Sequence, residues 1–269
     1  MIASIDTKAA REAVAPIFAG WNETLIWSAL QGVMGRIWAD DAAHPTMAQV
    51  WNGDFCFLAG DANHPDAREL IRNVPTDYQT PWMIYTPADA FWGEQIKRAY
   101  AGVYQEGERY AFYKESDGFD RERLQSFVNC LPAGFSFRQI DAELYATLLA
   151  WDWSRDFVSQ FSSGEEYVRR GLGYVVCHEG RPVGGASSYT VYNGGIEIEI
   201  HVVGEYRRRG LATACAARLI LDCLERGLYP NWDASNLHSV ALAQKLGYRL
   251  AHPYTVYYIE RSRILNLSI

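Results

Sequence analysis

The sequence predicts an α/β protein built from two consecutive domains, each with strands and helices in alternation. Three observations lead to this class. The chain has 269 residues, which suits two domains of ordinary size. In the first half, short apolar runs that end at turn residues alternate with helical segments. A second series of strands and helices then begins, so we expect a smaller N-terminal domain over residues 1–131 and a C-terminal domain over 132–269.

The first half carries the simpler pattern. Residues 1–35 favour helix, with Asn22 as a candidate cap before Leu25, Trp27 and Leu30, which recur near helical spacing. Strands are expected at 54–60, 80–87 and 108–115, and helices at 88–102 and 119–131. No chemical motif is recognisable in this half. We expect it to be a distant copy of the second α/β unit.

The second half gives the order β-α-α-β-β-β-α-β-α-β. Strands are expected at 132–141, 173–180, 181–192, 196–203, 228–235 and 248–260, and helices at 141–151, 154–171, 210–227 and 236–247. Asn193 and Gly194 form a strong hairpin signal between two of these strands. The helix over 210–227 has Leu211, Cys215 and Leu219 at a spacing of four, so one apolar face packs on a sheet.

Three arginines stand immediately before that helix. Arg207, Arg208 and Arg209 precede Gly210, which has no Cβ to obstruct a ligand. The first turn of a helix leaves backbone N–H groups without partners, and these groups and the helix dipole favour an anion. The segment therefore predicts a pyrophosphate cradle. A solvated basic turn is the alternative, and the strand before the arginines and the Asn-capped helix farther on favour the cradle.

These motifs resemble a known superfamily. "RRRGLA" fits the pattern Arg/Gln-x-x-Gly-x-Gly/Ala of the acyl-CoA pyrophosphate loop in GNAT N-acetyltransferases. "NLHSVALAQKLGY" is similar to the second hallmark of that superfamily, and the element order over 132–260 matches its topology. The whole chain resembles a two-part bacterial subfamily that includes the zwittermicin-resistance acetyltransferase. The resemblance implies a GNAT fold in the C-terminal half, with the N-terminal half as a degenerate GNAT-like copy.

The resemblance also implies acetyl-CoA as the acyl donor, and no metal. The backbone N–H groups of 208–213 would hold the pyrophosphate, and the strand before them would pair with the pantetheine arm. Asn236 matches an Asn that contacts the cofactor arm in the superfamily, and it is equally suited to cap the helix that follows. The cofactor-binding residues expected on this basis are Val202, Val203, Arg207, Arg208, Arg209, Gly210, Leu211, Ala212, Thr213 and Asn236.

Candidate catalytic groups lie on the strand that enters the loop. In "IEIEIHVV", strand alternation places Glu197, Glu199 and His201 on one face. Neighbouring carboxylates raise one another's pKa, so Glu197 and Glu199 are our candidates for the base or for amine-binding carboxylates. His201 is a weaker candidate at the substrate, and an ordinary polar sheet face is the alternative for all three.

Three further residues are weaker candidates for acceptor binding, namely Ser187, Ser188 and Asp233. Asp233 would bind a cationic acceptor or cap the next helix. Many superfamily members protonate the leaving thiolate with a Tyr four residues after the motif Ser, but here Ser239 is followed at that distance by Ala243. The sequence therefore leaves the general acid unassigned. Trp151, Trp153 and Trp232 wall the cleft or, as the simpler expectation, pack in the core.

The composition of the chain indicates which classes of binding partner are expected. The formal net charge of −7 argues against nucleic-acid binding and suits a cationic small-molecule amine. No apolar stretch approaches the roughly 20 residues of a membrane helix, and no secretion signal is recognisable. Five cysteines without a CxxC pair argue against zinc and disulfides and fit a reducing cytoplasm.

The predicted function is an N-acetyltransferase acting on a small amine, compatible with a detoxifying or resistance role. The alternatives are a non-catalytic acyl-CoA-binding module and an aminoacyl transferase of the tandem GNAT-like kind. We expect the first half to shape the acceptor pocket or to form the face of a homodimer.

Overall fold

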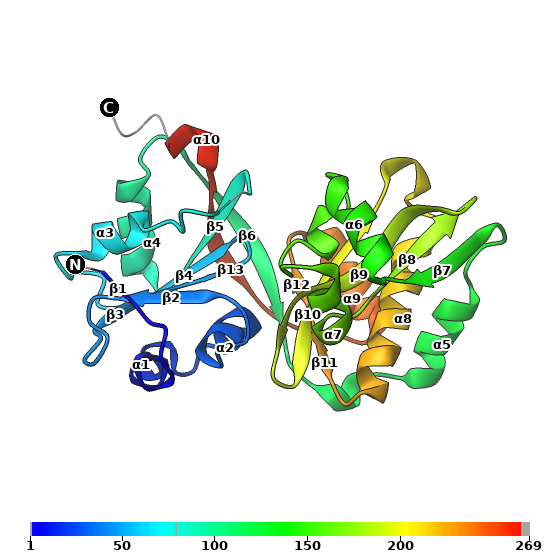
Figure 1. Cartoon of the computed structure of the whole chain (residues 1–269), viewed down its shortest axis with the longest axis horizontal. Coiled ribbons are helices and arrows are strands. Elements are labelled where there is room, and N and C mark those ends of the chain that lie inside the picture. Colours follow the sequence, from blue (N-terminus) through cyan, green and yellow to red (C-terminus); the bar gives the residue numbers. More distant parts are fainter. Residues whose placement is uncertain (1, 79, 265–269) are drawn as a thin grey trace. The chain divides into compact units, whose positions relative to one another are not determined.

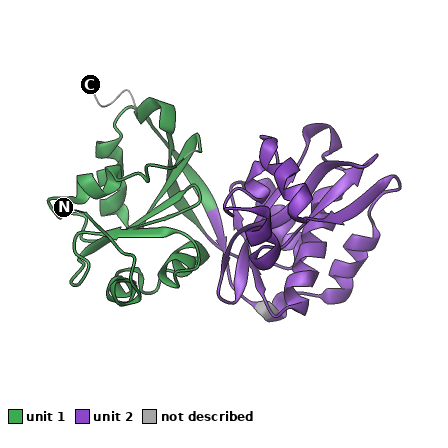
Figure 2. Cartoon of the chain, viewed as in Figure 1, with its two compact units in different colours: residues 1–109, 253–269 green, residues 110–252 purple. Residues whose placement is uncertain are grey.

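The structure is a computed structural model that describes residues 2–78 and 80–264. The chain forms two compact units (Figure 2). Unit 1 comprises Met1–Arg109 and Pro253–Ile269, and unit 2 comprises Tyr110–His252. No helix in the described part of the chain is both long and apolar enough to cross a membrane.

Unit 1 is built on a mixed sheet with the strand order β1-β2-β3-β4-β5-β13-β6. The strands are β1 (Ala3–Ser4), β2 (Arg36–Ala39), β3 (Met47–Asn52), β4 (Phe55–Gly60), β5 (Trp82–Pro87), β6 (Tyr104–Phe112) and β13 (Leu250–Glu260). The helices are α1 (Lys8–Val14), α2 (Thr24–Leu30), α3 (Ala67–Arg72), α4 (Ala90–Ala99) and α10 (Arg261–Ile264), with a 3-10 turn, η1, at Ala15–Phe18. Strands β6 and β13 each cross the boundary between the units.

The core of unit 1 is rich in aromatic side chains. Trp51, Tyr85, Trp92 and Tyr100 are almost fully buried in one cluster. The hydroxyl groups of Tyr85 and Tyr100 are 2.8 Å apart, and both donate to the carbonyl oxygen of Ile71. Buried phenols require such partners, so these hydrogen bonds allow large polar rings to fill the interior.

Unit 2 holds a five-stranded sheet with the order β11-β10-β9-β8-β7 (Figure 1). Its strands are β7 (Phe135–Gln139), β8 (Gly173–His178), β9 (Arg181–Tyr192), β10 (Gly195–Val202) and β11 (Tyr229–Asn231), and the short β12 (Asp233–Ala234) pairs with the end of β6. The helices are α5 (Arg121–Asn129), α6 (Ala142–Ala150), α7 (Gly164–Arg170), α8 (Leu211–Glu225) and α9 (Leu237–Leu246), with 3-10 turns η2 (Ser116–Gly118), η3 (Arg155–Phe157) and η4 (Gly204–Tyr206). All neighbouring strands are antiparallel except β10 and β11, which are parallel.

The mixed α/β class is confirmed, and so are the elements that position the loop. Asn193 and Gly194 connect β9 to β10 as a tight hairpin, with Gly194 at φ +100°. In α8, Leu211, Cys215 and Leu219 are buried on the sheet side, as their spacing predicted. Helix α8 ends before Gly227, whose φ of +68° suits only glycine without strain.

Three expectations differ from the structure. The helix expected at 154–171 is interrupted, because Ser163 caps a separate helix, α7, by accepting from the N–H of Glu166. Strands β2 and β3 and helix α3 were not predicted. The expected domain boundary at 131/132 falls inside unit 2, because α5 lies beside α8 (Figure 1) and the last strand, β13, pairs with β5 of unit 1.

The two units repeat one order of elements. Each has a first strand, two helical segments, three antiparallel strands, a helix and a strand that pairs in parallel. In unit 1 the parallel pair is β4–β5, and in unit 2 it is β10–β11. This repeated topology agrees with the expectation that the first half is a distant copy of the second.

Candidate active site

The loop between β10 and α8 adopts a conformation typical of anion-binding loops. Arg208 has a φ of +62° and Gly210 a φ of +81°. A positive φ at a non-glycine residue is strained, and such strain is concentrated at functional sites. Left-handed residues within a turn direct successive N–H groups to one side, which produces a concave anion site.

The amides of this loop have no acceptor in the part of the protein that the structure describes. Within residues 2–78 and 80–264, none of the backbone N–H groups of 208–213 donates a hydrogen bond, and the first amide of the helix that does so is Ala214, to Gly210. A Cβ on Gly210 would meet nothing within 4 Å, so the space above the loop is open. Six consecutive amides at a helix N-terminus fit a diphosphate.

The three arginines have different roles. The Nε of Arg207 donates to the carbonyl oxygen of Val202 at 3.0 Å, so this side chain braces the end of β10. The guanidinium of Arg209 lies 5.4 Å from the ring of Tyr206, and Arg208 is exposed. The loop therefore combines open amides with guanidinium groups at its rim.

Strands β10 and β11 separate next to this loop. Their pairing covers Gly195 to Glu197, opposite Tyr229 to Asn231, and β11 ends there whereas β10 continues to Val202. This geometry provides an open strand edge beside the loop.

The backbone groups along this edge alternate in direction. The N–H of Val203 donates to the carbonyl oxygen of Val183 in β9 at 2.9 Å, so Val203 is committed to the sheet. Antiparallel ladders alternate, so the backbone groups of Ile200 and Val202 point away from β9, toward the side where β11 has ended. An extended ligand can pair with β10 along this side.

The two glutamates of β10 lie at the point of separation. Glu197 is 5% exposed, and its carboxylate accepts from Nδ2 of Asn231 at 2.5 Å. Glu199 is half-buried and lies opposite Ser187 in the register. A register shift in the β9–β10 ladder falls between Glu197 and Ile198, and bulges of this kind are frequent beside active sites.

His201 lies on the sheet face covered by η3. Its ring centroid is 6.0 Å from that of Trp153. Burial and the nearby Arg207 lower the pKa of His201, whereas Asp156 raises it. Burial raises the pKa of the Asp156 carboxyl, although the charges of Arg155 and His201 oppose this shift. The lowered pKa favours a neutral imidazole that is able to accept a proton.

The serines of β9 are structural in their surroundings. Both are fully buried. The hydroxyl of Ser187 donates to the carbonyl oxygen of Phe157 at 2.6 Å. It accepts a hydrogen bond from the hydroxyl of Tyr167, also at 2.6 Å. Ser188 accepts from the backbone N–H of Leu172 at 2.9 Å. These hydrogen bonds do not favour a role for either serine in binding an acceptor.

The residues that follow β11 complete the description. Asn236 caps α9, with its Oδ1 accepting from the N–H of Ser239 at 3.0 Å. Asp233 belongs to β12 and is half-buried. Ala243 is fully buried, and Tyr248 donates to the carbonyl oxygen of Pro230. The hydroxyl of Tyr248 is thus engaged in the core.

The corresponding segment of unit 1 lacks these features. Between β4 and α3 the chain carries Asp61 and Asp66 and no arginine or lysine. Strand β5 remains paired with β4 from Phe55 to Leu58, without the early separation found in unit 2. Two carboxylates repel a diphosphate, so unit 2 alone carries a loop of the anion-binding kind among the described residues.

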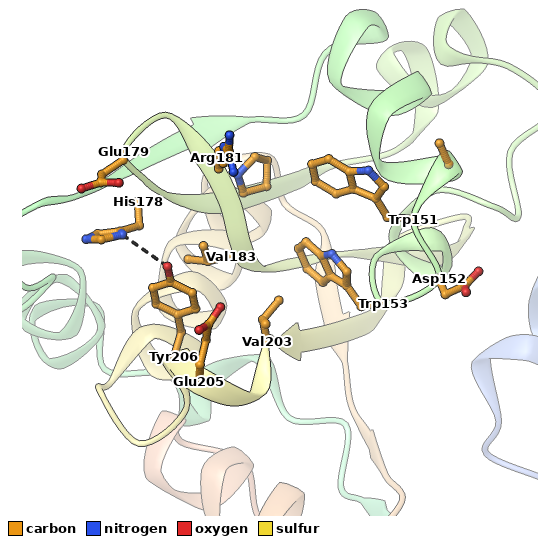
Figure 3. Close-up of a pocket in the computed structure, with 12 residues that line it drawn as sticks. Trp151, Asp152, Trp153, His178, Glu179, Arg181, Val183, Val203, Glu205 and Tyr206 are labelled. Atoms are coloured by element: carbon orange, nitrogen blue, oxygen red, sulfur yellow. Dashed lines mark hydrogen bonds between the residues drawn. The ribbon is translucent and has the colours of Figure 1, made fainter.

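A pocket of about 760 Å³ opens on unit 2 beside the loop (Figure 3). Trp151, Trp153, Glu205 and Tyr206 are among its lining residues. Core packing was the simpler expectation for the tryptophans, and it holds for Trp232, which is 3% exposed. Asp156, Glu205 and Tyr206 were not singled out from the sequence, although the last two stand within the motif that precedes the arginines.

Fold and loop together define an acyltransferase of the two-part GNAT type, and comparison with known proteins identifies the family. The model of the GNAT acetyltransferase family matches residues 15–257. The chain therefore belongs to the GNAT acetyltransferase family. Among the described residues, no group of three His, Cys, Asp or Glu side chains is arranged to hold a metal ion.

Relatives agree with this assignment. The crystal structure of a GCN5-related N-acetyltransferase-like protein from Streptococcus suis superposes on this chain with a TM-score of 0.86. The two sequences are 41% identical, and the match covers 93% of this chain and 98% of that one. The uncharacterized N-acetyltransferase YdfB of Bacillus subtilis is 28% identical over 242 residues, which are 87% of this chain and 90% of YdfB. A tandem GNAT protein from the clavulanic acid biosynthesis pathway shares the fold, at 13% identity and a TM-score of 0.56, over 97% of this chain and 98% of that one.

The protonation of His201 predicts a pH dependence of stability. Because folding lowers its pKa below the usual value of about 6.5, the unfolded state binds more protons on falling pH. This contribution to stability is therefore complete above about pH 6.5 and is lost as the pH falls through the folded-state pKa. Urea unfolding at pH 7.5 and 5.5 should show a smaller loss for His201→Gln than for the wild type. An equal loss in both proteins would contradict the assignment.

Proposed function

We propose that the protein transfers an acetyl group from acetyl-CoA to the amine of a small, cationic molecule. The observation that carries this proposal is the run of six open amides at 208–213, at the end of a strand whose parallel partner stops early. Acetyl-CoA offers a diphosphate for the amides and an extended arm for the strand edge. The bound coenzyme supplies an activated acetyl group.

Residues of unit 2 can bind the coenzyme, orient its arm and accept the proton of the substrate. The amides of the loop and the guanidinium groups at its rim bind the diphosphate. Backbone groups of Ile200 and Val202 orient the arm along β10. Glu199 takes a proton from the substrate ammonium, directly or through a water molecule, so that the free amine attacks the thioester, the C–S bond breaks and CoA leaves as the thiolate. The buried carboxylate of Glu197 attracts the same ammonium. Asn236 holds the first turn of α9 beside this site, and Asp233 adds a carboxylate.

Isothermal titration with acetyl-CoA, combined with a thiol-release assay over a panel of amines, tests the proposal. We expect micromolar binding and release of CoA that at least one amine accelerates. Binding without accelerated release would favour the non-catalytic acyl-CoA module. The absence of binding would refute the proposal.

The difference between the two units predicts the stoichiometry. Although the fold occurs twice, unit 1 has an acidic segment and a closed β4–β5 pair where unit 2 has the loop. We expect one acetyl-CoA per chain in the same titration. A stoichiometry near two would show that unit 1 binds the coenzyme by other means.

A further inference from the structure

The pocket beside the loop has an aromatic wall. Trp151 and Trp153 stack with ring centroids 6.0 Å apart and an angle of 25° between their planes. Trp151 is 37% exposed, which is unusual for the largest apolar side chain. Neither indole N–H donates a hydrogen bond within the described residues. A stacked pair with exposed faces at a cavity is a surface on which a ligand packs.

The opposite wall is polar. In Figure 3, Tyr206 and Glu205 lie across the pocket from the two indole rings, with Val183 and Val203 between them. The hydroxyl of Tyr206 is 3.4 Å from Nδ1 of His178, so this ring is held in place. The carboxylate of Glu205 makes no ion pair or hydrogen bond among the described residues.

The charge of the lining favours a cation. The lining includes three acidic residues, Asp152, Glu179 and Glu205, and one arginine, Arg181. In Figure 3, the carboxylates of Asp152 and Glu179 point away from the indole rings, which leaves Glu205 as the acid beside the cavity. An ammonium group between Glu205 and the indole rings gains from both the carboxylate and the aromatic faces.

The pocket also lies at a definite distance from the candidate base. Val203, in its floor, follows Glu199 by four residues, which is about 13 Å along an extended strand. The ring of Trp153 lines the pocket and is also near His201, which follows Glu199 by two residues on β10. A molecule that reaches from the base to Glu205 must therefore be elongated.

We propose that this pocket binds the far end of the acceptor, and that this end is a second cationic group on an apolar chain. The inference rests on the proposed function, because it assumes that the reacting amine is near Glu199. The acceptor class is thus a diamine or polyamine-like molecule rather than a monoamine. The apolar chain packs on Trp151 and Trp153, and the second ammonium pairs with Glu205.

Matched probes test the pocket. The probes are 1,8-diaminooctane and octylamine, which share the chain and differ in the second ammonium. Isothermal titration without acetyl-CoA should show the diamine binding roughly threefold to tenfold more tightly. Glu205→Gln should abolish this preference, and Trp151→Leu should weaken the binding of both amines. Glu179→Gln is the control, because it removes a carboxylate of the same lining that points away from the rings.

The outcomes separate the two proposals. Equal affinities for the two amines, or a preference that survives in Glu205→Gln, would overturn the assignment of the pocket. A Glu205-dependent preference that occurs without any amine-stimulated release of CoA would instead overturn the proposed function and leave the cation site in place. In the active enzyme, the KM for the diamine should be lower than the KM for octylamine by a similar factor.

Discussion

Gly210→Val is expected to weaken the binding of acetyl-CoA about 100-fold. Gly210 has a φ of +81°, which a β-branched residue adopts only with strain, so the loop must change its conformation. That change disperses the amides of 208–213, and hydrogen bonds to a charged group contribute about 1.5–3 kcal/mol each. Isothermal titration with acetyl-CoA measures the loss.

Gly227→Val is the matched control for this variant. Gly227 follows the other end of α8, has a φ of +68° and, like Gly210, has open space where a Cβ would stand. Both substitutions should therefore cost about 1–2 kcal/mol of stability. Only Gly210→Val should reduce the affinity for the coenzyme. Equal affinities in the two variants would refute the role of the loop.

The second large effect is expected for Glu199→Gln. A general base contributes about 10²–10⁴-fold to the rate, so kcat/KM should fall by about that factor while the affinity for acetyl-CoA is unchanged. The amide is nearly the same size as the carboxylate, and Glu199 is half-buried, so the melting temperature should change little. Steady-state kinetics over pH 6–9 measures both the loss of rate and the disappearance of the acidic limb of the profile, which reports protonation of the base.

Glu197→Gln provides the contrast. Glu197 accepts from Asn231, and a glutamine oxygen preserves that hydrogen bond, so the fold of the strand ends should be retained. We expect this variant to raise the KM for the amine more than it lowers kcat, because an attractive charge is lost and not the base. If Glu197→Gln lowered kcat as much as Glu199→Gln, the two roles would have to be exchanged or shared.

The loop could be predicted from the sequence because its chemistry is local. Arg207 to Gly210 are consecutive and stand directly between a strand and an apolar helix, and this context favours open amides over a solvated basic turn. The hairpin at Asn193 and the apolar face of α8 are local as well. Each of these signals depends on residues within one or two turns of chain.

Strand β3 could not be predicted in the same way. It is buried along its whole length and includes Gln49 and Asn52, whose polar side chains interrupt the apolar run. The Nε2 of Gln49 donates to the carbonyl oxygen of Leu70, 21 residues away, which is what makes its burial acceptable. Such a partner is visible only in three dimensions.

The pocket was missed for a similar reason. Trp151 and Trp153 were expected to wall the cleft or, more simply, to pack in the core, because tryptophan is usually buried. Their position opposite Glu205 depends on how the interrupted segment after α6 folds over the sheet, and residues 154–171 had been expected as one continuous helix. The proximity of His201 to Asp156 likewise depends on that segment.

The path of β13 limits how the protein can be dissected. This strand leaves unit 2 after His252 and pairs with β5 of unit 1 from Tyr257 to Glu260. A C-terminal fragment that begins at residue 110 would carry Val256 and Ile259 without the sheet that buries them. An exposed apolar strand of this kind promotes aggregation. To express unit 1 alone, the terminal strand must therefore be joined to residues 1–109 by circular permutation, so that it remains next to the strand with which it pairs.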